Sequence, residues 1–496
     1  MKPPASLKSY VLPRLQDVLF ILIFFFILRF GSNLLRDGDP GRHITIGKYM
    51  IENHSILTHD IFSYTMYGQP LTPHEWLAQV AYGASYLALG MSGVILLAAI
   101  VIAITAVLVY REILRRNLPH LIAFVLALWA VGMTSAHWLA RPHLFTLLFL
   151  ALWTPRLCRL SEGESLPLWQ FPLIMLIWAN THGGFIAGFV VWGMLLAAWL
   201  WDNFVNSKKP SRIILRNLCI AGGASFIVTF FNPAGWRLWV TSLGYVTNRY
   251  LTEFTREYRS LDFHSIGAWP FLAFLALAFL ILSRAWKKLP TSESLLLAGW
   301  LPLALYSGRN MPLFAIIATP ILAGQLQPII KSSPLAERLT KPIENIEHQL
   351  RGGAWTLLAV ICAGIFMGTG HTFNISGTDY QFNSIEFPVD AVNWLESHPQ
   401  GGNIYNFCRW GGYLIYRMWP AQHVFIDGQT DFYGEQFTRQ YEQVQDADSG
   451  WREVLKQYDI QWILVPPNTP IALVLQNDPA WSVIYQDQTS VIIRQH

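Results

Sequence analysis

Residues 18–43 read VLFILIFFFILRFGSNLLRDGDPGRH, an apolar run that changes abruptly into a short polar segment with two aspartates. The run begins near Leu15 and is long enough to cross a bilayer, which predicts a first membrane span. The basic segment before it is not followed by a small-residue cleavage site, so we expect this span to stay in the protein. Asp37 and Asp39 then lie directly outside the membrane.

The composition of the whole chain is that of a membrane protein. Of its 496 residues, 53% are hydrophobic and only 13% are charged, whereas soluble domains carry roughly 25% charged residues. Apolar runs recur from Leu15 to about Gly370 and then stop, which predicts a membrane domain at 1–370 and a separate domain at 371–496. The net charge of +4 is spread over the loops without a basic patch, so we expect no nucleic-acid partner.

About eleven segments are apolar enough to be transmembrane helices, because a span needs roughly 20 apolar residues. They lie at 15–35, 93–110, 119–138, 142–155, 168–181, 184–202, 213–231, 267–284, 293–308, 310–326 and 354–370. The short run at 142–155 is the weakest, and a half-helix is the alternative there. The stretch HEWLAQVAYGASYLALG (74–90) is also apolar, but counting it as a span would put every basic loop on the wrong side. We therefore predict an interfacial helix at 74–90.

Loop charges predict the orientation of the chain in the membrane. Lys and Arg residues gather in the loops at 111–116, 156–159, 208–212, 284–288 and 331–341. Cytoplasmic loops carry the excess of Lys and Arg, so these loops and the N-terminus are expected to be cytoplasmic. An odd number of spans then places the C-terminal domain and the long first loop (36–92) on the outer side.

The loops on the predicted outer side hold most of the polar residues of the membrane domain. Our candidates for substrate binding are His43, Asp60, His74, Glu75, His143 and His182. Polar residues at the ends of apolar helices are costly unless they serve a site or pair with one another. For any single residue, a helix cap or an interfacial anchor is the simpler interpretation. Their coincidence in several loops favours a site on the outer side.

Asp37 and Asp39 are the candidates for catalysis. Two close carboxylates raise one another's pKa, which suits a general base, or they could share a divalent ion such as Mg²⁺ or Mn²⁺ with His43. The simpler alternative for Asp39 is that it caps a helix starting after Pro40. Asp37 has no such capping role, so it is the first choice for the base.

The order of these features resembles the GT-C superfamily of membrane glycosyltransferases, which use polyprenyl-phosphate-linked sugars. The first-loop stretch DGDPGRHITIGKYMIENHSILTHDIFSYTMYGQPLTPHEWLAQV and the later stretch WGGYLIYRMWPAQHVFIDGQTDFYG resemble a bacterial group within it. That group is related to the protein mannosyltransferases and to the aminoarabinose transferases of lipid A. The similarity covers the whole chain in architecture but is confined to residues 37–79 and 405–434 in its motifs.

The resemblance implies a GT-C-like enzyme of the bacterial cytoplasmic (inner) membrane. Such an enzyme moves a hexosyl or pentosyl group from a polyprenyl-phosphate-sugar donor to a glycan, lipid or protein acceptor on the outer side. It makes Asp37 or Asp39 the catalytic base or metal contact, although several members have adjacent Asp and Glu where this chain has Asp-Gly-Asp. Arg forms paired contacts with phosphate oxygens, so Arg141, Arg309 and, as a second choice, Arg259 are the candidates for binding the donor phosphate.

Residues 371–496 alternate helical and strand patterns and predict a small α/β domain. Strands are expected at GNIYNF (402–407), HVFIDG (423–428) and DIQWILVP (459–466), followed by a hairpin at 481–495.

Two other functions compete with the transferase. A transporter or flippase would place ionisable residues at mid-membrane and show repeats or broken helices. A non-catalytic assembly protein would have no need of Asp37 and Asp39. Polar residues at the ends of the spans favour the transferase.

Overall fold

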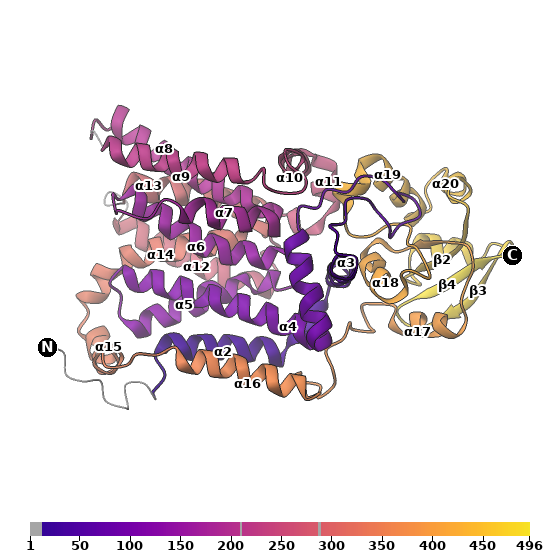
Figure 1. Ribbon diagram of the computed structural model, residues 1–496, viewed down its shortest axis with the longest axis horizontal. Helices are drawn as coiled ribbons and strands as arrows, with labels where there is room; N and C mark the ends of the chain where they lie inside the picture. Colours follow the sequence, from indigo (N-terminus) through magenta and orange to yellow (C-terminus); the bar gives the residue numbers. More distant parts are fainter. Residues whose placement is uncertain (1–11, 209–210, 286–288) are drawn as a thin grey trace.

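The computed structural model describes residues 12–208, 211–285 and 289–496. A bundle of helices makes up one end of the molecule and the α/β domain the other, and most helices of the bundle run along the long axis (Figure 1). The segment before residue 12 and parts of two basic loops, 209–210 and 286–288, lie outside the described residues. The chain is thus a multi-pass membrane protein with one large terminal domain.

The bundle and its loops contain α-helices and a few short 3₁₀ helices that matter for the site. The α-helices are α2 (Leu15–Arg29), α3 (Asp39–Glu52), α4 (Trp76–Arg115), α5 (His120–Thr134), α6 (His143–Ser161), α7 (Gln170–Thr181), α8 (Ile186–Phe204), α9 (Arg212–Val228), α10 (Arg237–Thr247), α11 (Arg249–Phe254), α12 (Trp269–Ala285), α13 (Thr291–Tyr306), α14 (Met311–Lys331), α15 (Pro334–Glu347) and α16 (Ala354–Gly368). The 3₁₀ helices are η1 (Gly31–Leu35), η3 (Gly183–Phe185), η4 (Arg256–Tyr258) and η7 (Gly308–Asn310).

Each predicted span coincides with a helix of the bundle. Within the described residues, six helical segments are long and apolar enough to cross a membrane by length and composition: Trp76–Arg115, His120–His137, His143–Ser161, Gly183–Phe204, Ile266–Arg284 and Gly308–Lys331. Others, such as the apolar helix Ala354–Gly368, are shorter. The helical nature of the predicted spans is confirmed, while their number stays a prediction.

Two uncertain segments of the bundle are now defined. α6 is a full helix of 19 residues, so the half-helix expected as an alternative at 142–155 is wrong. α4 has non-helical backbone at Leu89 and Gly90, and the part before this bend lies across the ends of the other helices (Figure 1). A helix over most of 74–90 is thus confirmed, while its position on the membrane surface stays a prediction.

The basic segment after α14 contains helix α15. Glu347 at the end of α15 accepts a hydrogen bond from Leu15 N (2.6 Å) and pairs with Arg14 (3.4 Å). Glu344 pairs with His120 at the start of α5 (2.8 Å). α15 thus ties α2 and α5 together at the end of the bundle that faces away from the α/β domain.

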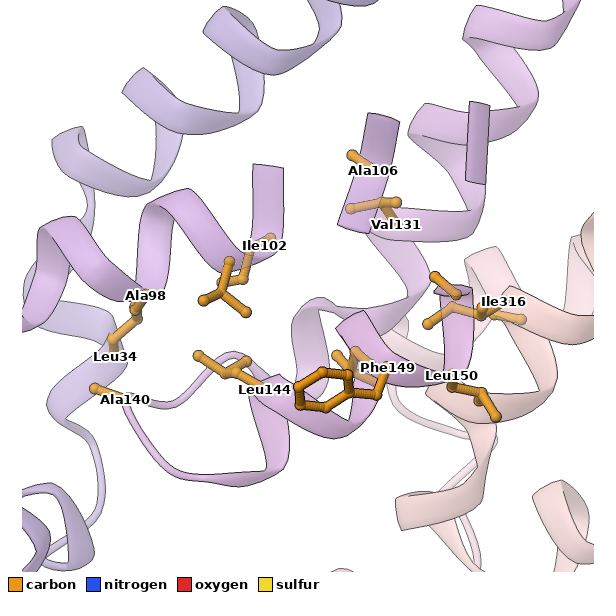
Figure 2. Close-up of a cluster of buried hydrophobic side chains, with 14 of the residues drawn as sticks. Leu34, Ala98, Ile102, Ala106, Val131, Ala140, Leu144, Phe149, Leu150 and Ile316 are labelled. Carbon is orange, nitrogen blue, oxygen red and sulfur yellow. The ribbon is translucent and has the colours of Figure 1, made fainter. Parts of the chain in front are cut away.

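The core of the bundle lies where α4, α5, α6 and α14 meet. Ala98 and Ala106 of α4, Val131 of α5, Leu150 of α6 and Ile316 of α14 are all buried there (Figure 2). Lipid tails are as apolar as these side chains, so helices associate in membranes through close packing, which small residues allow. α4 is the central helix, because it packs against α2, α5 and α6.

The terminal domain has a four-stranded sheet of order β1-β2-β4-β3. Its elements are α17 (Val389–Ser397), β1 (Asn403–Asn406), α18 (Gly411–Met418), α19 (Thr430–Gln445), α20 (Trp451–Gln457), β2 (Ile460–Val465), α21 (Pro470–Leu475), β3 (Trp481–Gln486) and β4 (Val491–Gln495). β1 and β2 are parallel, whereas β4 is antiparallel to both β2 and β3. Side chains alternate along β2: Trp462 and Leu464 join one core with α18, while Ile463 and Val465 join another with α19, α20 and α21. The predicted α/β domain and its final hairpin are confirmed.

The strand expected at 423–428 is wrong. Its backbone is not part of the sheet, and only Val424 forms a bridge, which is to Ser63 of the first loop. Tyr64 N donates to Val424 O (3.2 Å) and Val424 N donates to Phe62 O (3.0 Å). The segment thus forms backbone hydrogen bonds, but its partner is the first loop of the membrane domain.

Paired topology reporters test the orientation. A fusion after Arg116 should report cytoplasm, and fusions at Gly235 and at the C-terminus should report the outer side, because the basic loops stay inside. Each position is fused to a phosphatase in one version and to a green fluorescent protein in another. The two reporters give opposite signals on the two sides of the membrane. Cytoplasmic fluorescence from the C-terminal fusion would place the α/β domain and Asp37 on the wrong side for the function proposed below.

Candidate functional site

Arg141 lies in the loop between α5 and α6, at the end of the bundle next to the α/β domain. Ala140 N donates to Leu34 O (2.9 Å), and Tyr82 OH donates to Arg141 O (3.1 Å). The first bond ties the loop to η1, and the second ties it to the interfacial part of α4. Arg141 is therefore fixed beside the acidic segment that follows η1.

The Arg141 guanidinium contacts three carboxylates from two different loops. Nη1 lies 2.7 Å from Asp37 Oδ2 and 2.8 Å from Glu257 Oε1, and Nη2 lies 2.9 Å from Asp39 Oδ2. The predicted catalytic and phosphate-binding residues thus meet at one point. Glu257, which we did not predict, completes the cluster from η4.

The carboxylates of this cluster differ in their affinity for protons. Burial and the nearby Asp39 carboxylate raise the pKa of Asp37, and Arg141 only partly opposes them. In contrast, the charge of Arg141 lowers the pKa of Glu257. The Asp37 side chain is 27% exposed and the Asp39 side chain only 8%. Asp37 is therefore the carboxylate that is both reachable and inclined to take a proton, as a general base must be.

The expected capping role of Asp39 is wrong. α3 begins at Asp39 itself, and its N-cap is Gly38, which has no side chain to cap it. The Asp39 carboxylate faces Arg141 instead. We expected Asp37 to have no capping role. However, its Oδ1 accepts a hydrogen bond from Asp39 N (3.3 Å), so Asp37 supports the start of α3.

Arg309 of η7 provides a second cation at the site. Its Nη1 donates to the Tyr258 hydroxyl (3.0 Å), and its Nη2 lies 3.5 Å from His182 Nε2. Glu257 Oε2 lies 3.9 Å from Nη1. Gly308 N donates to the carbonyl of Arg259 (2.9 Å), which pins η7 to the loop that carries Glu257. The partly exposed Arg309 side chain lies next to the Arg141 cluster and can meet an anionic ligand.

Glu75, at the N-cap of α4, lies among predicted histidines. His182 Nε2 is 3.6 Å from its carboxylate, and His43 Nε2 and His74 Nε2 are each 3.9 Å away. Trp76 Nε1 next to it donates to the Asn180 side chain (2.6 Å), which holds the start of α4 against the end of α7. Four predicted substrate-binding residues therefore form one polar cluster beside Arg309.

His143 has a structural partner. Its Nε2 lies 2.5 Å from the carbonyl of His137, and His137 Nε2 in turn lies 3.1 Å from the carbonyl of Gly308. The ring of His143 is 6.4 Å from that of His182. His143 is thus close to the site, and its Nε2 is engaged with the backbone of the segment before α6.

Two predicted site residues lie elsewhere. Arg259 is exposed and donates to the carbonyl of Glu253 (3.2 Å). Asp60 accepts hydrogen bonds from Ser63 N (3.0 Å) and Ser63 Oγ (2.7 Å), so it orders a turn of the first loop. The structure gives no support to phosphate binding by Arg259 or substrate binding by Asp60.

Asp39 and His43 were considered as ligands of a metal ion, but their side chains do not point at a common position. The Asp39 carboxylate faces Arg141, whereas His43 Nδ1 faces the side chain of Gln79 (3.4 Å). Within the part of the chain that the structure describes, His, Cys, Asp and Glu residues form no group of three or more that could hold a metal. These residues do not fit a divalent ion, and Arg141 supplies the positive charge among the carboxylates.

Comparisons with known proteins support the fold. No protein-family model and no curated protein matches the chain. The apo oligosaccharyltransferase of Archaeoglobus fulgidus matches with a TM-score of 0.58 and 12% identity, over 91% of this chain and 69% of that one. ArnT from Cupriavidus metallidurans bound to undecaprenyl phosphate matches with a TM-score of 0.46 and 12% identity, over 96% and 97% of the chains. The first likeness shows that this chain shares the fold of that oligosaccharyltransferase, in agreement with the predicted fold class of a helical membrane bundle with a terminal α/β domain.

Replacing Arg141 by Met should destabilise the protein in a pH-dependent way. Breaking a buried ion pair by removing one partner costs about 3–5 kcal/mol. Without the cation, the clustered carboxylates repel one another and their folded-state pKa values rise above the unfolded ones, so stability is lost as the pH rises. We expect the unfolding temperature to fall most near pH 8 and to recover towards wild type near pH 5.

Thermal unfolding of the purified protein in detergent at several pH values measures this effect. Arg259→Met, an exposed arginine of a nearby loop, is the control and should unfold like wild type at each pH. If Arg141→Met lowers the unfolding temperature by the same amount at pH 5 and pH 8, carboxylate repulsion is not the cause of the loss.

Proposed function

We propose that this protein is a membrane glycosyltransferase that moves a sugar from a polyprenyl-phosphate-linked donor to a hydroxyl of an acceptor on the outer side. The observation that carries the proposal is the partly exposed Asp37 carboxylate with its raised pKa, held by Arg141 at the end of the bundle beneath the α/β domain. Sharing the fold of an oligosaccharyltransferase supports the same class of reaction.

The geometry supports a division of roles. Arg309 binds the donor phosphate and stabilises the negative charge that grows on it as the sugar leaves, because an arginine makes strong charge-assisted hydrogen bonds to phosphate oxygens. Asp37 takes the proton of the acceptor hydroxyl. The acceptor oxygen then bonds to the anomeric carbon while the bond from that carbon to the phosphate oxygen breaks. Glu75 and its histidine neighbours are placed to hydrogen-bond the hydroxyls of the sugar.

The distribution of charge in the bundle does not suit a transporter. In the described spans, the Asp, Glu, Lys, Arg and His residues lie within the first or last two turns of the helices, as Asp17 does in α2 and Glu293 in α13. Glu293 pairs with Arg116 (2.6 Å) near the end of α4, on the side away from Asp37. Transporters bind their substrates near the bilayer midplane between broken helices. A surface reaction at one end of the bundle explains the arrangement better.

Asp37→Asn should abolish sugar transfer while expression and folding stay near wild type. Asn keeps the shape of Asp but cannot accept the proton, and general-base catalysis contributes about 10²–10⁴-fold to a rate. Mass spectrometry of surface glycans and glycoproteins in a deletion strain, with and without each variant gene, measures transfer. Glu253→Gln, in an exposed part of the outer loop, is the control and should restore the wild-type pattern.

The Asp39→Asn variant is compared in parallel. If Asp39 is essential and Asp37 is not, the two residues exchange roles and the mechanism stands. A glycan pattern that is fully restored by the Asp37→Asn/Asp39→Asn double variant would rule out a carboxylate base at this site.

Arg309→Ala should weaken the binding of undecaprenyl phosphate. A hydrogen bond to a charged group contributes about 1.5–3 kcal/mol, so we expect a loss of roughly tenfold or more in affinity. Titration calorimetry in detergent micelles measures the dissociation constant. Arg259→Ala, which removes an exposed arginine outside the cluster, should bind as wild type does. Equal affinities for wild type and Arg309→Ala would remove Arg309 from the phosphate site.

A further inference from the structure

The first loop and the α/β domain touch backbone to backbone. A Cβ atom on Gly412 of α18 would lie 2.5 Å from Gly38 O, and a Cβ on Gly38 would lie 2.6 Å from Arg409 O. A Cβ on Gly41 would lie 2.8 Å from Gly412 O. No side chain separates the two backbones at these points, so the α/β domain has little room to shift against the start of α3.

The loop 427–429 of the α/β domain, just before α19, lies against the Asp39 carboxylate. A Cβ on Gly428 would come within 2.5 Å of Asp39 Oδ1. The chain leading to this loop is fixed by Asn406 of β1, whose Oδ1 accepts from Phe425 N (2.8 Å) and whose Nδ2 donates to Ile426 O (2.9 Å). The sheet of the α/β domain therefore determines where Gly428 sits relative to Asp39.

Arg42 of α3 connects the same loop to Asp39 by charge. Its Nη1 donates to Gln429 Oε1, and its Nε lies 3.9 Å from Asp39 Oδ1. Burial disfavours the charged guanidinium, but Asp427 and Asp39 more than compensate and raise the pKa of Arg42. Burial also raises the pKa of Asp427 to about 6, although Arg42 opposes this. Arg42 is thus a buried cation shared between the α/β domain and the first loop.

The two oxygens of Asp39 are accordingly held from opposite sides. Arg141 of the bundle contacts Oδ2, while Arg42 and the backbone at Gly428 confine Oδ1. We infer that the loop 427–429 positions the Asp39 carboxylate through Arg42 and Gly428, and that the α/β domain is therefore part of the active site. Asp427 and Gln429 are positioning residues in this arrangement, because they act through Arg42.

The position of Asp39 also governs that of Asp37. Asp39 N donates to Asp37 Oδ1, and both carboxylates share the guanidinium of Arg141. A shift of Asp39 therefore moves the base that we assign to Asp37. The inference rests on the proposed function for its catalytic meaning, but the placement of Asp39 can be measured independently of catalysis.

Two variants disturb the contact from the α/β domain. Gly428→Ala directs a methyl group at Asp39 Oδ1, and the backbone of Gly428 does not have a positive φ that alanine would resist. Gly401→Ala is the matched control, because a Cβ there meets nothing within 4 Å in the same domain. Gln429→Leu removes the acceptor of the buried Arg42, and Gln429→Glu, which keeps an acceptor, tests for rescue.

The rate of transfer from the undecaprenyl-phosphate sugar that the wild type uses is the first readout. A displacement on the order of 1 Å costs up to about a hundredfold in rate, so Gly428→Ala and Gln429→Leu should lower kcat at least tenfold. The KM for the donor should stay within about twofold, because the donor contacts Arg309, and Gln429→Glu should recover part of kcat. Wild-type kcat in both variants, in an enzyme that does require Asp37 or Asp39, would overturn the positioning role and leave the proposed function intact.

Carbodiimide labelling of Asp39 in the full-length protein is the second readout and needs no turnover. The Asp39 side chain is 8% exposed, so peptide mass spectrometry should find it protected in the wild type and in Gly401→Ala. Labelling should rise several-fold in Gly428→Ala and Gln429→Leu. Unchanged protection in both variants would overturn the inference even if no transfer can be measured, whereas increased labelling without any transfer would contradict only the proposed function.

Discussion

The ion pairs of Arg141 hold together segments that meet only in the folded protein. Carboxylates from the first loop and from η4 would repel one another strongly in a partly buried place, since charges interact more strongly where water is excluded. One guanidinium with donors on two sides contacts Asp37, Asp39 and Glu257 at once. Because the same loop is bonded to η1 and to α4, this cluster also fixes where the first helix, the interfacial helix and the outer loops lie relative to each other.

The membrane explains why the polar chemistry is divided between the two ends of the bundle. An ionisable side chain in the hydrocarbon region is expensive, so such residues gather at helix ends and pair there. The end away from the α/β domain uses its pairs, such as Arg116 with Glu293, to tie helices together. The other end carries Asp37 and Arg309, which are both partly exposed, and a bend at Gly90 that sets the first part of α4 across the helix ends.

The sequence was sufficient for the spans and for most members of the site, but not for contacts that depend on three-dimensional assembly. Apolar runs are local, so the helices could be located, although the polar residues around Pro155 hid the full length of α6. Glu257 stands in a loop without a pattern and acquires its role only by meeting Arg141. The segment 423–428 has the composition of a strand, yet its hydrogen bonds are made to the first loop, which no local pattern reveals.

The contact between Gly428 and Asp39 has a consequence for biosynthesis. About 390 residues separate the two positions. Because chains are synthesised at about 5–20 residues per second, Gly428 is synthesised about 20–80 s after Asp39. During that interval the surface of the α/β domain that confines Asp39 has not been made. A nascent or truncated chain without the α/β domain therefore lacks the contacts that Gly428 and Gln429 make with the first loop.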